Sequence, residues 1–236
     1  LLEYKDKLQH CYTTKCNDYK EDDGSNYKNL YKSLKLDYNK LVRIEHQIHS
    51  NLIDKEDNEN KKYTNVDGLV TDLKGVSLSL RFADCTPIYF YDPVKNVIGN
   101  VHSGWRGTVQ KIAQEGVKKL ISEYNCDTKD IIACIGPAIG KCHFEVDEDV
   151  KDVFENTFSY MNINDKIIQK GEIKEGKQKY FIDTNLINRR LLEDIGLKPE
   201  NIIESNICTV CHSDLLHSYR VDKDKSGRNT SIIGLI

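Results

Sequence analysis

Three segments of this chain gather cysteine, histidine, tryptophan and arginine side chains that can ligate metals, act as nucleophiles or bind anions. The first, residues 43–50, reads Arg-Ile-Glu-His-Gln-Ile-His-Ser. The second comprises residues 83–87 and, further along, residues 102–107. The third runs from Cys208 to Arg228. A hydrophobic core does not require such residues in close succession, so we expect the chemistry of the protein in these segments.

Cys85 and His102 lie on either side of an expected β-hairpin, and this pair leaves two chemistries open. A Cys–His dyad would be a nucleophile and its base, as in thiol hydrolases. With His49 as a third member, the same pair would form an open zinc site with three protein ligands and one water. Thiolate and imidazole suit zinc or copper better than magnesium or calcium. The plain alternatives are that Cys85 is a small buried apolar residue and that His49 lies on the surface.

Cys208-x-x-Cys211 with His212 resembles half of a zinc ribbon, but no second cysteine pair follows it. The strand and helix that flank a redox Cys-x-x-Cys are not clear here either. We therefore expect Cys208 and Cys211 to be reduced thiols near the wall of the site. The remaining cysteines are expected to be reduced thiols of a cytoplasmic protein: Cys11, Cys16, Cys126, Cys134 and Cys142.

Arginines concentrate in the same segments although lysines dominate the 34 basic residues. Of seven arginines in the chain, five fall in or beside them: Arg43, Arg81, Arg106, Arg220 and Arg228. A guanidinium fork suits phosphate and carboxylate, so this clustering favours an anionic or phosphate-bearing ligand. The alternative is that some of them form structural ion pairs.

The elements that would position these residues alternate between groups of strands and isolated helices. Apolar and β-branched runs predict strands at 76–80, 87–91, 97–101 and 131–135, with a turn at 92–96 joining two of them as a hairpin. Helical spacing of apolar residues predicts helices at 108–124, 147–158 and 183–196. We expect an α+β fold with mixed, largely antiparallel sheets and flanking helices. The polar segments 17–29 and 54–65 are expected to be surface loops, and 162–179 a hairpin or excursion.

The 236 residues, 39% hydrophobic and 30% charged, suffice for one sizeable core, and we expect a single domain over residues 1–236. A net charge of −3 argues against a general nucleic-acid binder. No apolar run approaches the roughly 18 residues of a membrane span, and no signal peptide is visible at the start. We therefore expect neither nucleic acid nor a membrane as a partner. Of the possible oligomeric states, we favour a monomer.

Together, the motifs resemble the YfiH-type laccase-domain family, also called polyphenol oxidoreductase or purine nucleoside phosphorylase proteins. The resemblance covers nearly the whole chain, and its most diagnostic strings are Ala83-Asp84-Cys85-Thr86-Pro87 and His102-Ser103-Gly104-Trp105-Arg106-Gly107. Further matching strings stand at residues 10–15, 47–50, 135–140, 144–146, 208–209, 218–220 and 227–228. Departures are Cys11 and Ser50 for Gly, Ser103 for Ala, and a shortened Asp/Asn-rich N-terminal loop. The loop change bears on the side from which substrate enters.

The resemblance implies a Zn²⁺ site made by His49, Cys85 and His102, with zinc more fitting than copper. It implies phosphorolysis of adenosine, inosine, guanosine and S-methyl-5′-thioadenosine to the free base and ribose 1-phosphate, and also adenosine deamination. Asp84 is a candidate proton carrier or hydrogen-bond partner of a zinc-bound His, or else forms a turn or cap hydrogen bond. The expected substrate-binding residues, toward nucleoside and phosphate, are Arg43, Gln47, Trp105, Arg106 and Arg220. Trp105 would stack on a purine unless it serves packing.

Two other activities stay open at this point. A metal-free Cys85–His102 hydrolase or amidase would fit the editing of peptidoglycan precursors that has been attributed to the family. A polyphenol oxidase with bound copper is the other alternative. It fits less well, because a laccase needs a blue-copper site and a largely His-built trinuclear cluster, and the chain has seven His.

Overall fold

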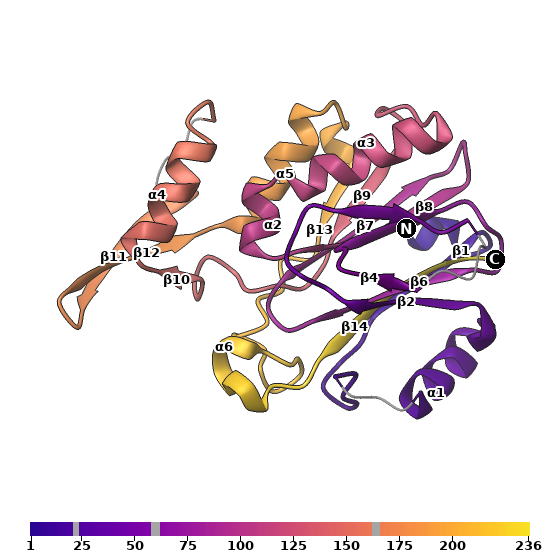
Figure 1. Cartoon of the computed structure of the whole chain (residues 1–236), viewed down its shortest axis with the longest axis horizontal. Coiled ribbons are helices and arrows are strands. Elements are labelled where there is room, and N and C mark those ends of the chain that lie inside the picture. Colours follow the sequence, from indigo (N-terminus) through magenta and orange to yellow (C-terminus); the bar gives the residue numbers. More distant parts are fainter. Residues whose placement is uncertain (21–23, 58–61, 162–165) are drawn as a thin grey trace.

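The computed structural model describes residues 1–20, 24–57, 62–161 and 166–236, and two of its β-sheets lie face to face (Figure 1). Helices cover the outer face of each sheet. The hydrophobic residues accordingly form three clusters: helices against the larger sheet, sheet against sheet, and α1 against the smaller one. This is the α+β architecture predicted from the sequence.

The larger sheet has six strands in the order β13-β9-β7-β8-β5-β3. Their bounds are β3 Ile53–Lys55, β5 Gly68–Thr71, β7 Thr86–Asp92, β8 Val97–Ser103, β9 Ile132–Ile135 and β13 Ile202–Glu204. The hairpin expected from the sequence is confirmed, with Pro87 opposite His102 and Asp92 opposite Val97. Asp92 Oδ1 closes its turn by accepting the backbone N–H groups of Val94 and Lys95, at 2.8 and 2.9 Å.

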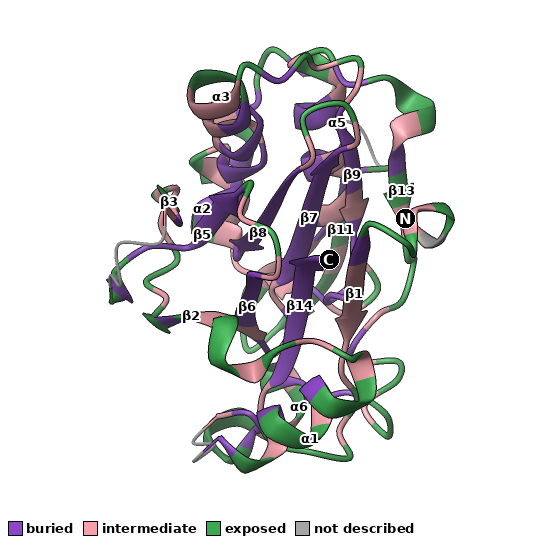
Figure 2. Cartoon of the chain, turned by 90° about the vertical axis from the view of Figure 1, so that its right-hand side faces the viewer, coloured by how far each residue is buried: buried purple, intermediate pink, exposed green. Residues whose placement is uncertain are grey.

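The second sheet has five strands in the order β1-β14-β6-β2-β4. Their bounds are β1 Leu8–Tyr12, β2 Leu41–His46, β4 Tyr63–Thr64, β6 Ser77–Phe82 and β14 Asn229–Leu235. β14 is buried along its whole length, between β1 and β6, and pairs antiparallel with both (Figure 2). β2 pairs parallel with β6. Among the described strand pairs antiparallel pairing predominates, as expected.

A small third sheet, β10-β12-β11, projects beside α4 at the left of Figure 1. It comprises β10 Glu145–Val146, β11 Ile168–Lys174 and β12 Lys177–Ile182, and α4 spans Glu148–Thr157. β11 and β12 confirm the hairpin expected within residues 162–179, of which 162–165 lie outside the described residues. The structure corrects the expectation of a loop over 17–29, because α1 begins at Ser25 and buries Tyr27 and Tyr31 against Ile232. The loop expected at 54–65 includes the end of β3 and all of β4, and its residues 58–61 are not described.

The remaining helices are short or lie on the sheets. Their bounds are α1 Ser25–Leu34, α2 Trp105–Val109, α3 Ile112–Tyr124, α5 Thr184–Asp194 and α6 Tyr219–Asp222, with 3₁₀ turns η1 Leu2–Tyr4, η2 Tyr38–Lys40, η3 Pro199–Asn201 and η4 Lys223–Lys225. The single helix expected over 108–124 is two helices, because Lys111 has a left-handed backbone with φ of 61°. Among the described residues, no helix is long and apolar enough to cross a membrane.

Asn100 on β8 links the two large sheets through a fully buried hydrogen-bond network. Its Nδ2 donates to Ser231 Oγ at 2.8 Å and to the Leu78 carbonyl at 3.2 Å. In return, Ser231 Oγ donates to Asn100 Oδ1 at 3.0 Å. A polar group buried between apolar sheets is tolerated only when it is satisfied in this way, so the network also fixes how β8 faces β14.

We expect Asn100→Ala to lower the free energy of unfolding by about 1–3 kcal/mol, because it leaves Ser231 and the Leu78 carbonyl without their buried donor. Urea denaturation followed by circular dichroism would measure this. Asn39→Ala, at an exposed amide in η2, is the control and should change the free energy of unfolding by less than about 0.5 kcal/mol. Equal stability of the two variants would contradict the structural role of Asn100.

Candidate metal centre

His49, Cys85 and His102 converge where the two large sheets come together at one end. His49 lies in the turn after β2, Cys85 in the turn between β6 and β7, and His102 near the end of β8. Their ligand atoms all lie within 4.8 Å of one another. The two imidazole rings are 4.9 Å apart between centroids and nearly perpendicular, at 74°. The structure therefore brings together the three residues that the sequence analysis grouped.

Asp67, directly before β5, orients this group. Its Oδ1 accepts a hydrogen bond from His102 Nδ1 at 2.8 Å, which leaves the Nε2 atom of that ring available to a metal. The same carboxylate accepts the backbone N–H groups of His49 at 3.0 Å and Ser50 at 2.6 Å. Sequence reasoning missed Asp67, whose one local signal is an acidic residue next to a fully buried strand.

The ionisation of Cys85 and His102 is coupled. Burial raises the pKa of the Cys85 thiol, but His102 and His49 lower it by more than burial raises it. The resulting pKa is about 6, below the ordinary value of a thiol. Burial lowers the pKa of His102, whereas Cys85 and Asp67 raise it, to about 9. Each group therefore favours the charged form of the other, a thiolate beside an imidazolium, and metal binding would release the imidazolium proton.

Gly104 allows the start of α2 to approach the three side chains closely. A Cβ atom at this position would lie 2.7 Å from His49 Cδ2 and 3.2 Å from Cys85 Sγ. Any side chain there would push His49 or Cys85 out of place. The glycine of the 102–107 string is therefore a spatial requirement of the site.

A cavity of about 940 Å³ opens beside the three side chains, which is within the range of small-molecule sites. Its apolar wall includes Trp105, Ile139 and Phe144. Basic side chains that also line it are Lys20, Arg81, Arg106, Lys179, Arg220 and Arg228, and acidic ones include Glu45, Glu145, Asp147 and Asp149. Such a lining can accept a ligand with an apolar ring and an anionic group.

Arg220 and Asp84, both predicted to be functional, are tied together in this wall. Asp84 Oδ2 accepts the backbone N–H of Arg220 at 2.6 Å, and Oδ1 accepts the Thr209 hydroxyl at 2.6 Å. Arg220 Nη1 donates to the carbonyls of His143 and Glu145, at 3.0 and 3.1 Å. Asp84 thus holds the start of α6, which carries Arg220, while the carboxylate that accepts from the His102 ring belongs to Asp67.

Trp105 and Arg106 line the cavity as a pair. The Arg106 guanidinium lies over the indole ring of Trp105, 4.4 Å from its centroid, and is exposed to solvent. Behind, the indole packs against Phe154, with ring centroids 6.4 Å apart. Trp105 therefore packs as well as lining the cavity.

Gln47 and Arg43 have partners within the protein. Gln47 Nε2 donates to the Arg81 carbonyl at 3.0 Å, and its Oε1 accepts the Arg81 backbone N–H at 2.9 Å. Its amide therefore joins the end of β2 to β6 at the cavity wall. Arg43 lies outside the residues that line the cavity, and its guanidinium sits over the Tyr27 ring at 4.9 Å.

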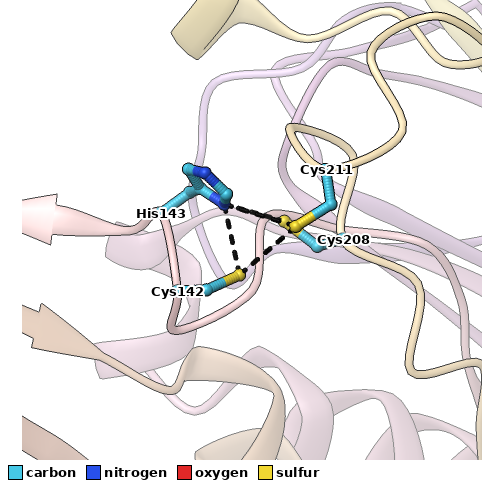
Figure 3. Close-up of side chains that lie close together, drawn as sticks. All are labelled: Cys142, His143, Cys208 and Cys211. Atoms are coloured by element: carbon cyan, nitrogen blue, oxygen red, sulfur yellow. Dashed lines mark hydrogen bonds between the residues drawn. The ribbon is translucent and has the colours of Figure 1, made fainter.

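Cys142 is a free thiol, and the structure places it next to other potential metal ligands, which the sequence analysis did not predict. Cys142 and His143 meet Cys208 and Cys211 in a second cluster, in which the four ligand atoms also lie within 4.8 Å of one another (Figure 3). The partners of Cys208 and Cys211 precede them in the chain, whereas the zinc-ribbon pattern would place a second cysteine pair after Cys211.

Residues 9–236 match the family described as "Multi-copper polyphenol oxidoreductase laccase". The chain belongs to this family. The Bacillus subtilis protein named purine nucleoside phosphorylase YlmD is 38% identical over 169 residues, covering 72% of this chain and 58% of that protein. Mouse purine nucleoside phosphorylase LACC1 is 33% identical over 179 residues, covering 74% of this chain and 39% of that protein. The aligned part is thus less than two thirds of either relative.

Solved structures of the family share the fold. The Bacillus licheniformis protein YfiH superposes with a TM-score of 0.88 at 32% identity, covering 99% of this chain and 94% of that one. YlmD from Geobacillus stearothermophilus gives a TM-score of 0.84 at 30% identity, covering 97% and 92% of the two chains. These matches confirm the family resemblance drawn from the motifs.

In metal-stripped protein, we expect the alkylation rate of Cys85 by iodoacetamide to reach half of its plateau near pH 6. The thiolate is the reacting species, so the rate falls below that pH as the thiol is protonated. Mass spectrometry of the Cys85 peptide measures it, and Zn²⁺ should protect. Cys11, whose thiol pKa is raised to about 12 by burial, is the internal comparison and should stay unmodified at neutral pH. A midpoint near the ordinary thiol value of about 8.5 would contradict the proposed Cys85–His102 coupling.

Asp67→Asn should raise the Zn²⁺ concentration that half-protects Cys85 about 10- to 100-fold, because His102 loses its charged acceptor. The matched control is Asp92→Asn, which alters another fully buried carboxylate that accepts two backbone N–H groups, in the β7–β8 turn. This control should leave zinc protection unchanged. Wild-type protection in Asp67→Asn would show that Asp67 does not support the site.

Proposed function

We propose that this chain is a purine nucleoside phosphorylase that holds Zn²⁺ with His49, Cys85 and His102. The observation that carries the proposal is the convergence of two imidazoles and a thiolate beside a 940 Å³ cavity with basic and aromatic walls. Relatives named purine nucleoside phosphorylase support it. The substrates we propose are adenosine, inosine, guanosine and S-methyl-5′-thioadenosine, with phosphate.

The donor set fits an open zinc site, with three protein ligands and Asp67 behind one of them. When bound there, zinc would supply a Lewis acid next to the cavity. The seven His do not fit a laccase. Within the described ranges, which include all seven, the two candidate metal groups use only His49, His102 and His143. This distribution favours zinc over the copper clusters of an oxidase.

The remaining groups would bind and orient the two substrates. Arg106 and Arg220 offer guanidinium forks for phosphate, and the carbonyls of His143 and Glu145 fix the plane of Arg220. Trp105 and Phe144 offer apolar surface for the purine. A phosphate oxygen bonds to ribose C1′ while the bond from C1′ to the purine nitrogen breaks, its electron pair leaving with the base, which takes up a proton. Asp84 positions Arg220 in this scheme, and its predicted role as proton carrier remains a prediction.

The test is a nucleoside panel, with and without phosphate, on protein of measured metal content. Release of hypoxanthine from inosine should require phosphate, and should fall at least about 100-fold in Cys85→Ala and His49→Ala, since changing a ligand's supporting residue alone costs 10- to 100-fold. Cys16→Ser, at an exposed cysteine, is the control and should keep full activity. Retained activity in both ligand variants would refute the site.

The same panel tests adenosine deamination, which we propose as a second activity. It would convert adenosine to inosine and ammonia without phosphate. We also propose that the protein is cytoplasmic, which eight free cysteines support. That it is a monomer remains a prediction.

One observation favours a second candidate. The lowered pKa of Cys85 beside His102 would also suit a metal-free hydrolase or amidase, for instance one acting on peptidoglycan precursors. Hydrolysis of such a substrate that persists in full after zinc removal would favour that candidate. Phosphate-dependent release of hypoxanthine that is lost on zinc removal, and that added zinc alone restores, would favour the phosphorylase.

A further inference from the structure

The second cluster lies where two loops of the larger sheet meet. Cys142 and His143 are in the loop between β9 and β10, and Cys208 and Cys211 are in the loop after β13. Backbone pairing holds the loops together, because the Thr209 N–H donates to the Ala138 carbonyl at 3.0 Å. Figure 3 shows the three sulfur atoms and the His143 ring turned toward a common centre.

The spacing of the four ligand atoms fits one tetrahedral zinc ion. With Zn–S of about 2.3 Å and Zn–N of about 2.0–2.1 Å, tetrahedral edges are about 3.8 Å between sulfurs and about 3.6 Å between sulfur and nitrogen. Cys142 Sγ and Cys211 Sγ are 3.7 Å apart. His143 Nδ1 lies 3.2 Å from Cys142 Sγ, 3.5 Å from Cys211 Sγ and 3.6 Å from Cys208 Sγ. The other two pairs, Cys208 Sγ with Cys142 Sγ and with Cys211 Sγ, lie within 4.8 Å.

The surroundings favour a thiolate ligand and leave a route for the ion. The Gly140 backbone N–H donates to Cys208 Sγ at 3.2 Å, an interaction that stabilises a thiolate. Cys142 and Cys211 are exposed, so a metal can reach the cluster from solvent. A single disulfide would use two of the sulfurs and give no role to His143 or to the third cysteine.

We propose that Cys142, His143, Cys208 and Cys211 form a second metal site that binds Zn²⁺ in a closed Cys₃His tetrahedron. Four protein ligands leave no position for substrate, so the site is structural, in contrast to the open group at Cys85. It would lock two loops that carry part of the cavity wall. Phe144 follows His143 directly, and the Thr209 hydroxyl donates to Asp84. This inference does not rest on the proposed function.

The test is the zinc content of protein purified under reducing conditions and dialysed, measured by mass spectrometry of the metal. We expect two zinc ions per wild-type chain and one in Cys85→Ala. The double variant Cys142→Ser/Cys211→Ser should also hold one zinc ion, and zinc should still protect its Cys85 from iodoacetamide as in the wild type. The control variant Cys16→Ser should hold two zinc ions. Because Cys142 and Cys211 are exposed, their replacement by serine leaves the hydrophobic clusters intact.

Cobalt substitution in Cys85→Ala supplies an independent measurement. The Cys₃His site should give the intense visible bands of tetrahedral Co²⁺ and sulfur-to-cobalt charge transfer, both lost when Cys142 and Cys211 are also replaced. A wild-type chain with one zinc, of which none is left in Cys85→Ala, would overturn the proposal. A Cys142–Cys211 disulfide in reduced, zinc-supplemented protein would overturn it as well. Neither result depends on catalytic activity, so failure here is distinct from failure of the phosphorylase proposal.

Discussion

The site depends on the hydrogen bonds that the Asp67 carboxylate accepts. Asp67 is completely buried, and burying a carboxylate without hydrogen-bond partners would destabilise the fold. Its partners are the His102 ring and the turn that carries His49. His49 has a left-handed backbone with φ of 60°, a conformation that costs on the order of 1–2 kcal/mol for a residue with a side chain. The bonds to Asp67 stabilise that turn. Carboxylate, turn and imidazole are therefore mutually dependent, and none would adopt its position alone.

The two large sheets convert this local arrangement into a cavity. β2 belongs to one sheet and β8 to the other, and Asp67 connects the ends of both. The Gln47 amide joins β2 to β6 along the same edge. The loop after β9 adds Phe144 to the cavity wall, and α6 adds Arg220. The two sheets pack against each other through apolar side chains. The polar residues at the ends of their strands thus form one concave surface.

Sequence reasoning reached the features that depend on neighbours in the chain. The β7–β8 hairpin followed from two apolar runs around an Asp-Pro turn, and the hairpin placed Cys85 near His102. Asp67 was not predictable, because its role arises from a ring 35 residues away. The break between α2 and α3 falls at Lys111, which has a left-handed backbone although neither Gly nor Pro stands there to signal it. His143 and Cys208, 65 residues apart, meet because β9 and β13 are parallel neighbours in the sheet. No local sequence pattern predicts that these two strands are neighbours.

The position of β14 has a consequence for the order in which the chain can fold during synthesis. β1 is paired through its full length with β14, from Leu8 against Leu235 to Tyr12 against Ser231, and β14 also completes one side of β6. While the ribosome is still translating residues before 229, β1 has no strand to join, and one edge of β6 is open. Pairs so distant in sequence form slowly, and an open strand edge invites pairing with other chains. A nascent chain of this protein must therefore keep apolar strands such as β6 from aggregating until almost all of the residues described here have been made.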